Sequence, residues 1–413
     1  MAEPTEFVLE LSILLVAAIA GGLLIKRFGY PVALGELLVG IILGPSVFDL
    51  ISDQATVSVF AELGAIILLF YIGLETEMSN LRKQLLPSLS VGVLGALVPL
   101  VLCYYSALAL GISNQESLFL GVVFTATSIG ITIRLLKDMH KLNSPMGLTV
   151  LGAGIVDDVV AVILLSVVLN MLSGGINIFD ISWVVIKAIA FWAIIILFGS
   201  RLLWKIIDRV KLDDEYFILL LLSYGFLAAY ISAAIGLSVI VGAFAAGLPL
   251  TRAKPKVKMA LVQTRSLYMF FVPLFFISIG TLINLNVFGE AAFLGIIITI
   301  IAFAGKIIGS FAAARLNKFT VNDSLKISMS MTPRGEMGLI IASLGLTSGL
   351  ISTKTYSVGV MAVILTTFIA IPILKKMLSD KKEKKQSNTN EKKPESSVEN
   401  AATENINEDA KET

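Results

Sequence analysis

Long apolar runs follow one another along most of the chain, and they constrain its fold more than any other feature. The 413 residues are 56% hydrophobic and only 15% charged. An apolar run of about 18 or more residues is long enough to cross the hydrocarbon core of a bilayer as an α-helix. Most charged residues lie between the runs or near the C-terminal end. We therefore predict an all-α polytopic membrane protein.

Thirteen candidate spans can be delimited from these runs, and together they make up one transmembrane domain at residues 1–378. The spans cover residues 7–27, 31–47, 58–75, 85–111, 116–138, 147–173, 180–205, 215–233, 236–250, 266–284, 288–314, 322–350 and 354–377. The second and ninth spans are short, which is compatible with tilted or merged segments.

Basic residues alternate between the loops and set the predicted orientation. One set of loops carries clusters of them, for example Lys26 with Arg27 and Arg252 with Lys254, whereas the alternate loops carry almost none. The basic loops belong on the cytoplasmic side. An odd number of spans then places the N-terminus outside and the C-terminus inside. We expect a multi-pass protein of the plasma membrane of a prokaryotic cell.

The two ends of the chain differ in composition. Glu3 and Glu6 precede the first apolar run, and no basic residue does, so we interpret this run as a retained first helix and not a cleaved signal peptide. Residues 379–413 are charged, polar and nearly free of large apolar side chains. This composition predicts a disordered cytoplasmic tail, which is either a solvated extension or a partner-binding segment.

The scarcity of cysteine and histidine excludes several kinds of site. Cys103 is the single cysteine, so neither an internal disulfide nor a thiolate metal cluster can form. His140 is the single histidine, which argues against a histidine metal site or a catalytic triad. The sequence has no P-loop, so we do not expect the chain to hydrolyse ATP. We expect no enzymatic activity, no bound cofactor and no nucleic-acid partner.

Two adjacent carboxylates interrupt the sixth span, in the stretch GAGIVDDV. An ionised group within hydrocarbon is costly and usually serves an ion or proton path. Adjacent residues lie about 100° apart around a helix, so Asp157 and Asp158 need different partners. Lys306, in the eleventh span, lies at a similar depth of about 14 Å. We expect one aspartate to pair with Lys306 and the other to exchange ligands; the alternative is a structural salt bridge without transport.

Polar residues and proline interrupt two further spans, in the stretches FTATSIGIT and MTPRGEMG. The positions of interest are Thr127 and Ser128 in the fifth span and Pro333, Arg334 and Glu336 in the twelfth. Proline breaks the helical hydrogen-bond ladder, and a helix broken in a membrane is tolerated where it lines a cavity or is buried in protein. Half-helix ends then present carbonyl and N–H groups to ions. We predict that Thr127 and Ser128 bind the ion, with helix packing as the alternative, and that Pro333, Arg334 and Glu336 support the broken helix, the last two as an ion pair.

The positions of the breaks indicate an internal repeat. If the seventh span is a linker, the six spans before it and the six after it form two halves, and the broken span is the fifth of each half. Paired broken helices in corresponding positions are typical of secondary transporters built from inverted repeats. We therefore predict two inverted six-helix repeats whose broken helices cross.

Other residues of the early spans have structural interpretations. Gly40 and Gly44 form a GxxxG motif, which favours close packing between helices. Glu36 and Glu62 lie within the second and third spans, and we expect a structural or dimer-side role for both.

Several motifs together resemble those of the cation:proton antiporter-2 family, close to the NapA-type sodium/proton antiporters. They are LGELLVGIILGPS (34–46), ATSIGIT (126–132), GAGIVDDV (152–159), Lys306 in its helix, and TPRGEMGLI (332–340). The resemblance extends over about residues 7–378 and implies a homodimer with an NhaA/NapA-like fold. It implies a dimerisation part at about residues 7–75 and 215–284, a core ion-transport part at about 85–173 and 288–377, and a linker helix at about 180–205.

The resemblance also implies roles for individual residues. Asp158 corresponds to the aspartate that binds the cation or a proton, and Asp157 to the one that forms a salt bridge with the lysine at Lys306. Thr127 corresponds to the threonine of the broken fifth helix. An Asp–Asp pair with a lysine is similar to the electrogenic type, which exchanges more protons than cations.

These observations predict a secondary antiporter that exchanges Na⁺ for H⁺ by alternating access. The cation (Na⁺, Li⁺ or K⁺) and the proton would compete for Asp158, with Thr127, Ser128 and broken backbone as further oxygen ligands. Proton uptake is favoured because burial stabilises the neutral form of a carboxylate. A K⁺/H⁺ antiporter or a potassium efflux system of the same family is the alternative, and a membrane sensor or signalling component is a further one.

Overall fold

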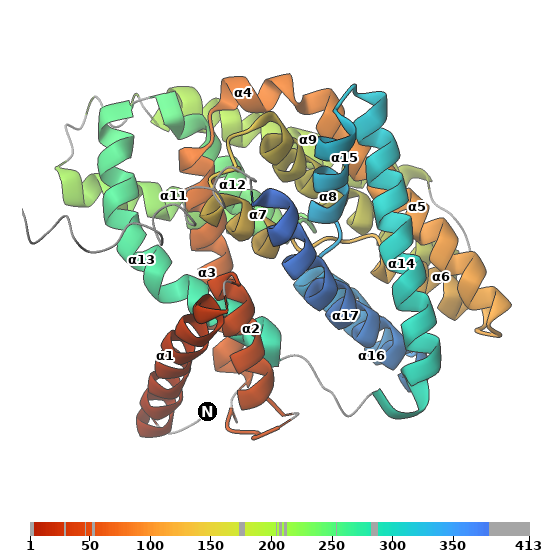
Figure 1. Ribbon diagram of the computed structural model, residues 1–413. Coiled ribbons are helices and arrows are strands. Elements are labelled where there is room, and N and C mark those ends of the chain that lie inside the picture. The colour runs from red at the N-terminus through yellow and green to blue at the C-terminus, as the bar shows by residue number, and fades with distance from the viewer. Residues whose placement is uncertain are drawn as a thin grey trace, which may run out of the picture. The chain divides into compact units, whose positions relative to one another are not determined.

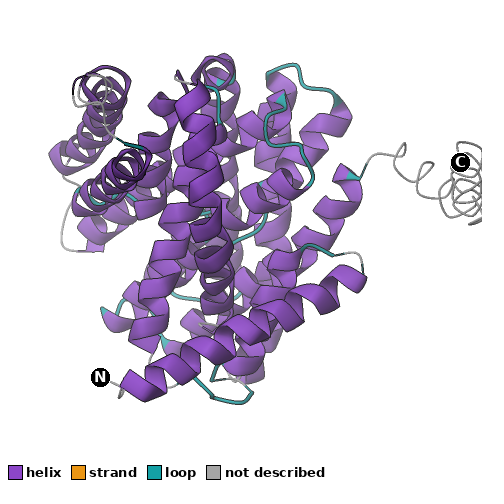
Figure 2. Cartoon of the chain, turned by 90° about the vertical axis from the view of Figure 1, so that its left-hand side faces the viewer, coloured by secondary structure: helices purple, strands orange, loops and turns teal. Residues whose placement is uncertain are grey.

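The computed structural model describes residues 4–28, 30–45, 47–51, 54–172, 178–203, 205, 209, 213–252, 254–281 and 288–379. In this part of the chain the secondary structure is helical and no strand occurs (Figure 2). Residues Met1–Lys375 form one unit and Lys376–Thr413 a second, and every predicted site residue belongs to the first unit. Apart from Ser379, the tail predicted to be disordered lies outside the described residues.

Helices follow one another along the whole first unit (Figure 1). Up to the middle of the chain they are α1 (Pro4–Arg27), α2 (Val32–Leu43), α3 (Gln54–Glu75), α4 (Met78–Lys83), α5 (Leu85–Ala109), α6 (Asn114–Val123), α7 (Ile129–Asp138), α8 (Pro145–Leu172), α9 (Ile178–Leu197) and the π-helix η1 (Phe198–Leu202). After it come α11 (Asp214–Ala234), α12 (Val239–Gly247), the 3₁₀-helix η2 (Leu248–Arg252), α13 (Lys254–Thr281), α14 (Phe288–Leu316), α15 (Val321–Ser330), α16 (Glu336–Thr347) and α17 (Thr353–Leu378).

These helices follow the thirteen predicted spans in order, with α6 and α7 as the two halves of the fifth and α15 and α16 as the halves of the twelfth. Among the described residues, eight helices are long and apolar enough to cross a membrane, and shorter apolar helices accompany them. The prediction of an all-α polytopic membrane protein is confirmed. The short helix α4, between the third and fourth spans, has no counterpart among the predicted elements.

Helix packing separates two groups on either side of the molecule in Figure 1. In the first, α3 packs on α12 and α13, α2 packs on α13 and α1, and α11 packs on α12. In the second, α5 packs on α6, α8 and α14, while α14 packs on α15, and α7 and α15 contact α8. We call them the α3 group and the α5 group. Whether they act as a dimerisation part and a transport part stays a prediction.

Glycines bring α2 and α13 of the α3 group into close contact. A Cβ atom added to Gly40 would lie 2.8 Å from the Cα of Gly280, and one added to Gly44 would lie 2.9 Å from the Cα of Thr281. Side chains at Gly40 and Gly44 would therefore force the two backbones apart. This is the close helix packing that the GxxxG motif predicts.

The two breaks, at residues 124–128 and 331–335, have local causes. At the first, the Thr125 hydroxyl donates to the carbonyl of Val122 at 2.8 Å, a side-chain bond that competes with the helical ladder. At the second, Pro333 has no N–H group to donate, and Gly335, which precedes α16, has a non-helical conformation with φ −154° and ψ −133°. Both breaks lie in the α5 group, and they meet each other.

Candidate functional site

A buried ion pair joins α8 to α14. Lys306 Nζ donates to Asp157 Oδ1 at 2.9 Å and to Oδ2 at 3.0 Å. Both side chains are 0% exposed. A buried charge is costly unless it is paired, and here each side chain supplies the opposite charge that the other requires. The structure places Lys306 beside Asp157, the partner that the resemblance implies.

Lys306 also contacts the first break. Its ammonium group donates to the backbone carbonyl of Thr125 at 2.6 Å. Thr125 lies just beyond the C-terminal end of α6, where carbonyl groups lack helical partners and the helix dipole favours a positive charge. One ammonium therefore holds three parts of the site together: the aspartate of α8, the lysine-bearing helix α14 and the broken backbone between α6 and α7.

Arg334 is a second buried cation that contacts the first break, although its own backbone lies in the second break. Its Nη1 donates to the carbonyls of Phe124 and, at 3.1 Å, of Ala126, and its Nη2 donates to the carbonyl of Ala302 at 3.4 Å. Glu336 begins α16, and its side chain lies outside the described residues, so the predicted ion pair with Arg334 stays a prediction. The partners that the structure shows for the guanidinium are carbonyls.

The two breaks cross through reciprocal hydrogen bonds. The Thr127 hydroxyl donates to the carbonyl of Met331 at 3.1 Å, and the backbone N–H of Ser128 donates to the carbonyl of Pro333 at 2.9 Å. One turn further, the Thr132 hydroxyl donates to the carbonyl of Ser330 at 2.8 Å. Predicted site residues that lie more than 200 positions apart are thus in direct contact.

Asp158 is the next residue of α8 after Asp157 and is 3% exposed. Gly154 lies one helical turn before it, on the same face of α8. Gly154 lines a narrow space together with Thr127 and Thr132 of the first broken span and Ser330 of the second. The structure therefore places hydroxyl groups of both broken spans along the face of α8 that carries Asp158.

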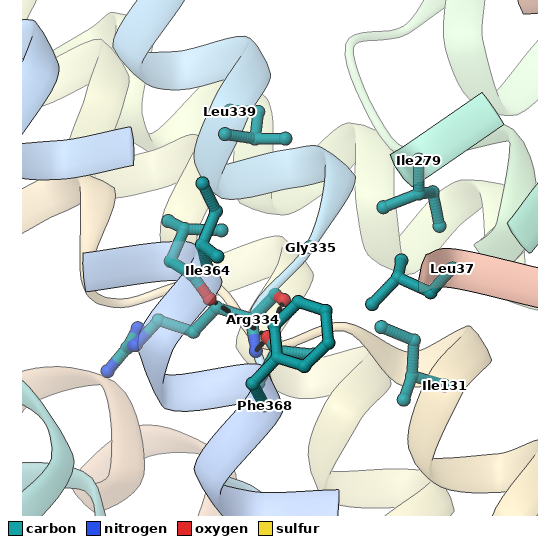
Figure 3. Close-up of a pocket in the computed structure, with 10 residues that line it drawn as sticks. Leu37, Ile131, Ile279, Arg334, Gly335, Leu339, Ile364 and Phe368 are labelled. Atoms are coloured by element: carbon teal, nitrogen blue, oxygen red, sulfur yellow. Dashed lines mark hydrogen bonds between the residues drawn. The ribbon is translucent and has the colours of Figure 1, made fainter. Parts of the chain in front are cut away.

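Thr367 of α17 contacts the second break and is not among the predicted site residues. Its hydroxyl donates to the carbonyl of Arg334 and accepts from the Arg334 N–H at 2.9 Å. It therefore pairs both backbone groups of Arg334, a residue of the second break that Figure 3 labels. The pair Thr366–Thr367 inside an apolar helix was the available signal.

Taken together, these groups can bind a small cation and a proton alternately. Asp157 is neutralised by Lys306, whereas Asp158 adds a second carboxylate to the same buried region. Hydroxyls and the carbonyls of unwound helix ends are the oxygen ligands that broken-helix transporters offer to Na⁺ and H⁺. That Asp158, Thr127 and Ser128 bind the ion stays a prediction.

Known proteins that this chain resembles include sodium/proton exchangers and antiporters. The sequence model of the family described as "Sodium/hydrogen exchanger, transmembrane" matches residues 12–379. A Na⁺/H⁺ antiporter of Enterococcus hirae is 32% identical, over 90% of this chain and 97% of its own length. The Na⁺/H⁺-K⁺ antiporter GerN of Bacillus cereus is 34% identical, over 90% of this chain and 96% of its own.

A solved structure supports the fold at lower sequence similarity. The sodium proton antiporter MjNhaP1 of Methanocaldococcus jannaschii aligns with a TM-score of 0.73 at 18% identity, and the alignment covers 91% of this chain and 97% of that one. At this identity the likeness concerns the arrangement of the helices alone.

Proposed function

The chain belongs to the sodium/hydrogen exchanger family, and we propose that it is a secondary antiporter that exchanges Na⁺ for H⁺ across the membrane it spans. The observation that carries the proposal is the buried Asp157–Lys306 pair beside Asp158, at the crossing of two broken helices. Since Lys306 already neutralises Asp157, the adjacent Asp158 can bind Na⁺ and a proton in turn.

Because Na⁺ and the proton compete for Asp158, the movement of one is coupled to the movement of the other. When Asp158 binds either Na⁺ or a proton, its charge is neutralised, and the cost of moving the site past apolar walls falls. An empty, ionised Asp158 has no such compensation, so the empty site is held back and uncoupled leak is suppressed. Lys306 adds a second proton if its link to Asp157 breaks during the cycle, which would make the exchange electrogenic.

Potassium is the second candidate cation. The relative GerN carries both Na⁺ and K⁺ in its name, and oxygen ligands of the kinds found here suit either ion. We propose Na⁺ as the preferred cation and treat K⁺ as an outcome of the experiment below.

The assembly and placement that we propose follow from the sequence. The antiporter is a homodimer in the plasma membrane of a prokaryote, with the N-terminus outside and the C-terminal tail in the cytoplasm. The distribution of basic loops supports this orientation.

The deciding experiment is cation-induced collapse of a proton gradient in proteoliposomes, with Na⁺, Li⁺ and K⁺ titrated separately. Asp158→Asn should abolish the response to every cation. Asp49→Asn is the matched control, because Asp49 is an exposed loop residue with a φ of 47°, a conformation that Asn adopts readily. Equal activity of Asp158→Asn and the wild type would reject the proposal.

A further inference from the structure

Two basic residues near the C-terminal end of α7 face glutamates of the α3 group. Arg134 Nη1 lies 3.1 Å from Glu36 Oε2, and its Nη2 donates to Oε1 at 3.2 Å. This two-point contact consists of one hydrogen bond and one ion-pair contact. Lys137 Nζ lies 3.0 Å from Glu75 Oε2. The half-helix that begins at the first break is thus tied to both α2 and α3.

The Arg134–Glu36 pair is the more buried of the two. Its side chains are 10% and 2% exposed, against 21% and 28% for Lys137 and Glu75. The Arg134 guanidinium also lies 4.9 Å from the centroid of the Phe276 ring in α13. A buried carboxylate that loses its partner is left as an uncompensated charge. Glu36 therefore holds Arg134 more firmly than Glu75 holds Lys137.

Apolar side chains meet across another part of the same boundary. Leu37 of α2 and Ile279 of α13 face Ile131 of α7 around a pocket that Leu339 and Phe368 also line (Figure 3). Within the α3 group, by contrast, α2 and α13 touch backbone to backbone at their glycines. The boundary between the groups is thus lined by side chains around a pocket, whereas backbone contact joins α2 to α13 within the α3 group.

We propose that the Arg134–Glu36 pair positions the ion site during transport, an inference that rests on the proposed function. The pair holds α7 against α2 in the conformation seen here, and with α7 it holds the break that carries Thr127 and Ser128. In transporters built from repeats, one bundle moves against the other around the site. Since the pair joins the two groups, it must separate for the site to face the other side of the membrane.

Asp138 offers Arg134 a second carboxylate on its own helix. It lies four positions after Arg134, a spacing at which side chains on a helix are neighbours. Both residues line an open cleft together with Lys26, Tyr30 and Lys375. When α7 moves away from α2, the guanidinium can pass from Glu36 to Asp138 and does not become an isolated charge. This exchange of partners makes the separation of a buried pair feasible.

Cross-linking tests the state of the boundary without requiring transport. In a Cys103→Ala background, Tyr30→Cys and Met139→Cys place one thiol on each side of the open cleft, because Tyr30 lies just before α2 and Met139 just after α7. A short, reducible bifunctional thiol reagent joins them when α7 lies against α2. We expect Glu36→Gln to lower the cross-linking rate in proteoliposomes roughly tenfold. Arg134→Lys keeps the charge but loses the two-point contact, and the decrease should be smaller.

Two further variants separate this role from a folding defect. Exchanging the charges, with Glu36→Arg and Arg134→Glu together, should restore most of the wild-type cross-linking rate. Glu215→Gln is the matched control, because Glu215 is an exposed carboxylate of α11 in the same group, and it should leave the rate unchanged. In the cross-linked protein, cation-driven proton movement should stop and should return after the reagent is cleaved.

Each outcome decides one of the two claims. An unchanged cross-linking rate in Glu36→Gln, or full exchange by the cross-linked protein, overturns the positioning role of the pair. If cross-linking responds as expected while no cation drives proton movement in the wild type, the proposed function is rejected, and control of the boundary by the pair is still supported.

Discussion

At the first break, residues 124–128, backbone carbonyls accept hydrogen bonds from two buried cations, Lys306 and Arg334. At the second, residues 331–335, the corresponding carbonyls accept from the hydroxyl of Thr127 and the N–H of Ser128. The two breaks occupy equivalent places in the two halves of the chain, yet among the described contacts only the first is occupied by fixed positive charge.

This difference bears on where a mobile cation can bind. The C-terminal end of a helix carries partial negative charge on its carbonyls. At the end of α6 that charge is offset by Lys306 and Arg334, which would repel a further cation. At the end of α15 the groups seen to donate to the carbonyls are neutral, and Thr127 lies there. We therefore expect a transported cation to be better accommodated on the side of Asp158, Thr127 and α15.

Removing the lysine should have the largest effect. Lys306→Gln leaves Asp157 as a buried, uncompensated carboxylate, and we expect the free energy of unfolding to fall by about 3–5 kcal/mol. Exchange should lose or change its dependence on membrane potential. Thermal unfolding in detergent and exchange at imposed potentials measure the two effects.

The double variant Lys306→Gln with Asp157→Asn is the control for this prediction. It removes both charges, and it should recover most of the lost stability. Electrogenic transport that is unchanged in Lys306→Gln would contradict the role given to the first break.

Arg334→Gln tests the other fixed cation. The carbonyls of Phe124 and Ala126 lose a donor in a buried place, and unsatisfied groups of this kind cost about 1–3 kcal/mol. We expect a decrease in thermal stability of that order. Arg334→Lys retains the charge but not the several N–H donors of the guanidinium, so its thermal stability should lie between those of the wild type and Arg334→Gln. If both variants were as stable as the wild type, the carbonyls would not need these hydrogen bonds.

Thr127→Val should have a smaller effect, and on binding more than on stability. The variant removes a hydroxyl at the crossing of the breaks, and we expect the half-maximal cation concentration to rise about fivefold, the equivalent of a hydrogen bond of about 1 kcal/mol. Thr299→Val is the control, because the buried Thr299 hydroxyl bonds to its own helix at Gly295. If both variants raise that concentration equally, Thr127 has no special role.

Thr367→Val should have the smallest effect and should leave cation affinity unchanged. Thr367 pairs the backbone of Arg334 within the second break, so its loss should lower stability by about 1 kcal/mol. The neighbouring Thr366 bonds only to the preceding turn of its own helix among the partners described. Thr366→Val should therefore lower the melting temperature less, and the reverse order would contradict the assignment.

Much of the fold could be predicted from the sequence alone. Hydropathy marks a membrane-crossing helix because such a segment must satisfy its own backbone hydrogen bonds and be apolar along its length. Proline and clustered hydroxyls marked the two breaks, because they compete with the helical ladder over a few residues. The charged residues of the site were visible for a similar reason, since Asp157, Asp158 and Lys306 interrupt apolar runs.

The partners of these residues were decided by the tertiary structure. Lys306 and Asp157 are 149 positions apart, and Arg134 and Glu36 are 98 apart, distances over which no local pattern specifies a contact. The Arg334 guanidinium bonds to carbonyls 208 and 32 positions away. Every residue has a carbonyl, so the sequence contains no sign of which ones the fold leaves without a helical partner. Short-range chemistry thus determined the spans, their breaks and the charged positions, and the packing of distant helices determined which charge meets which carbonyl.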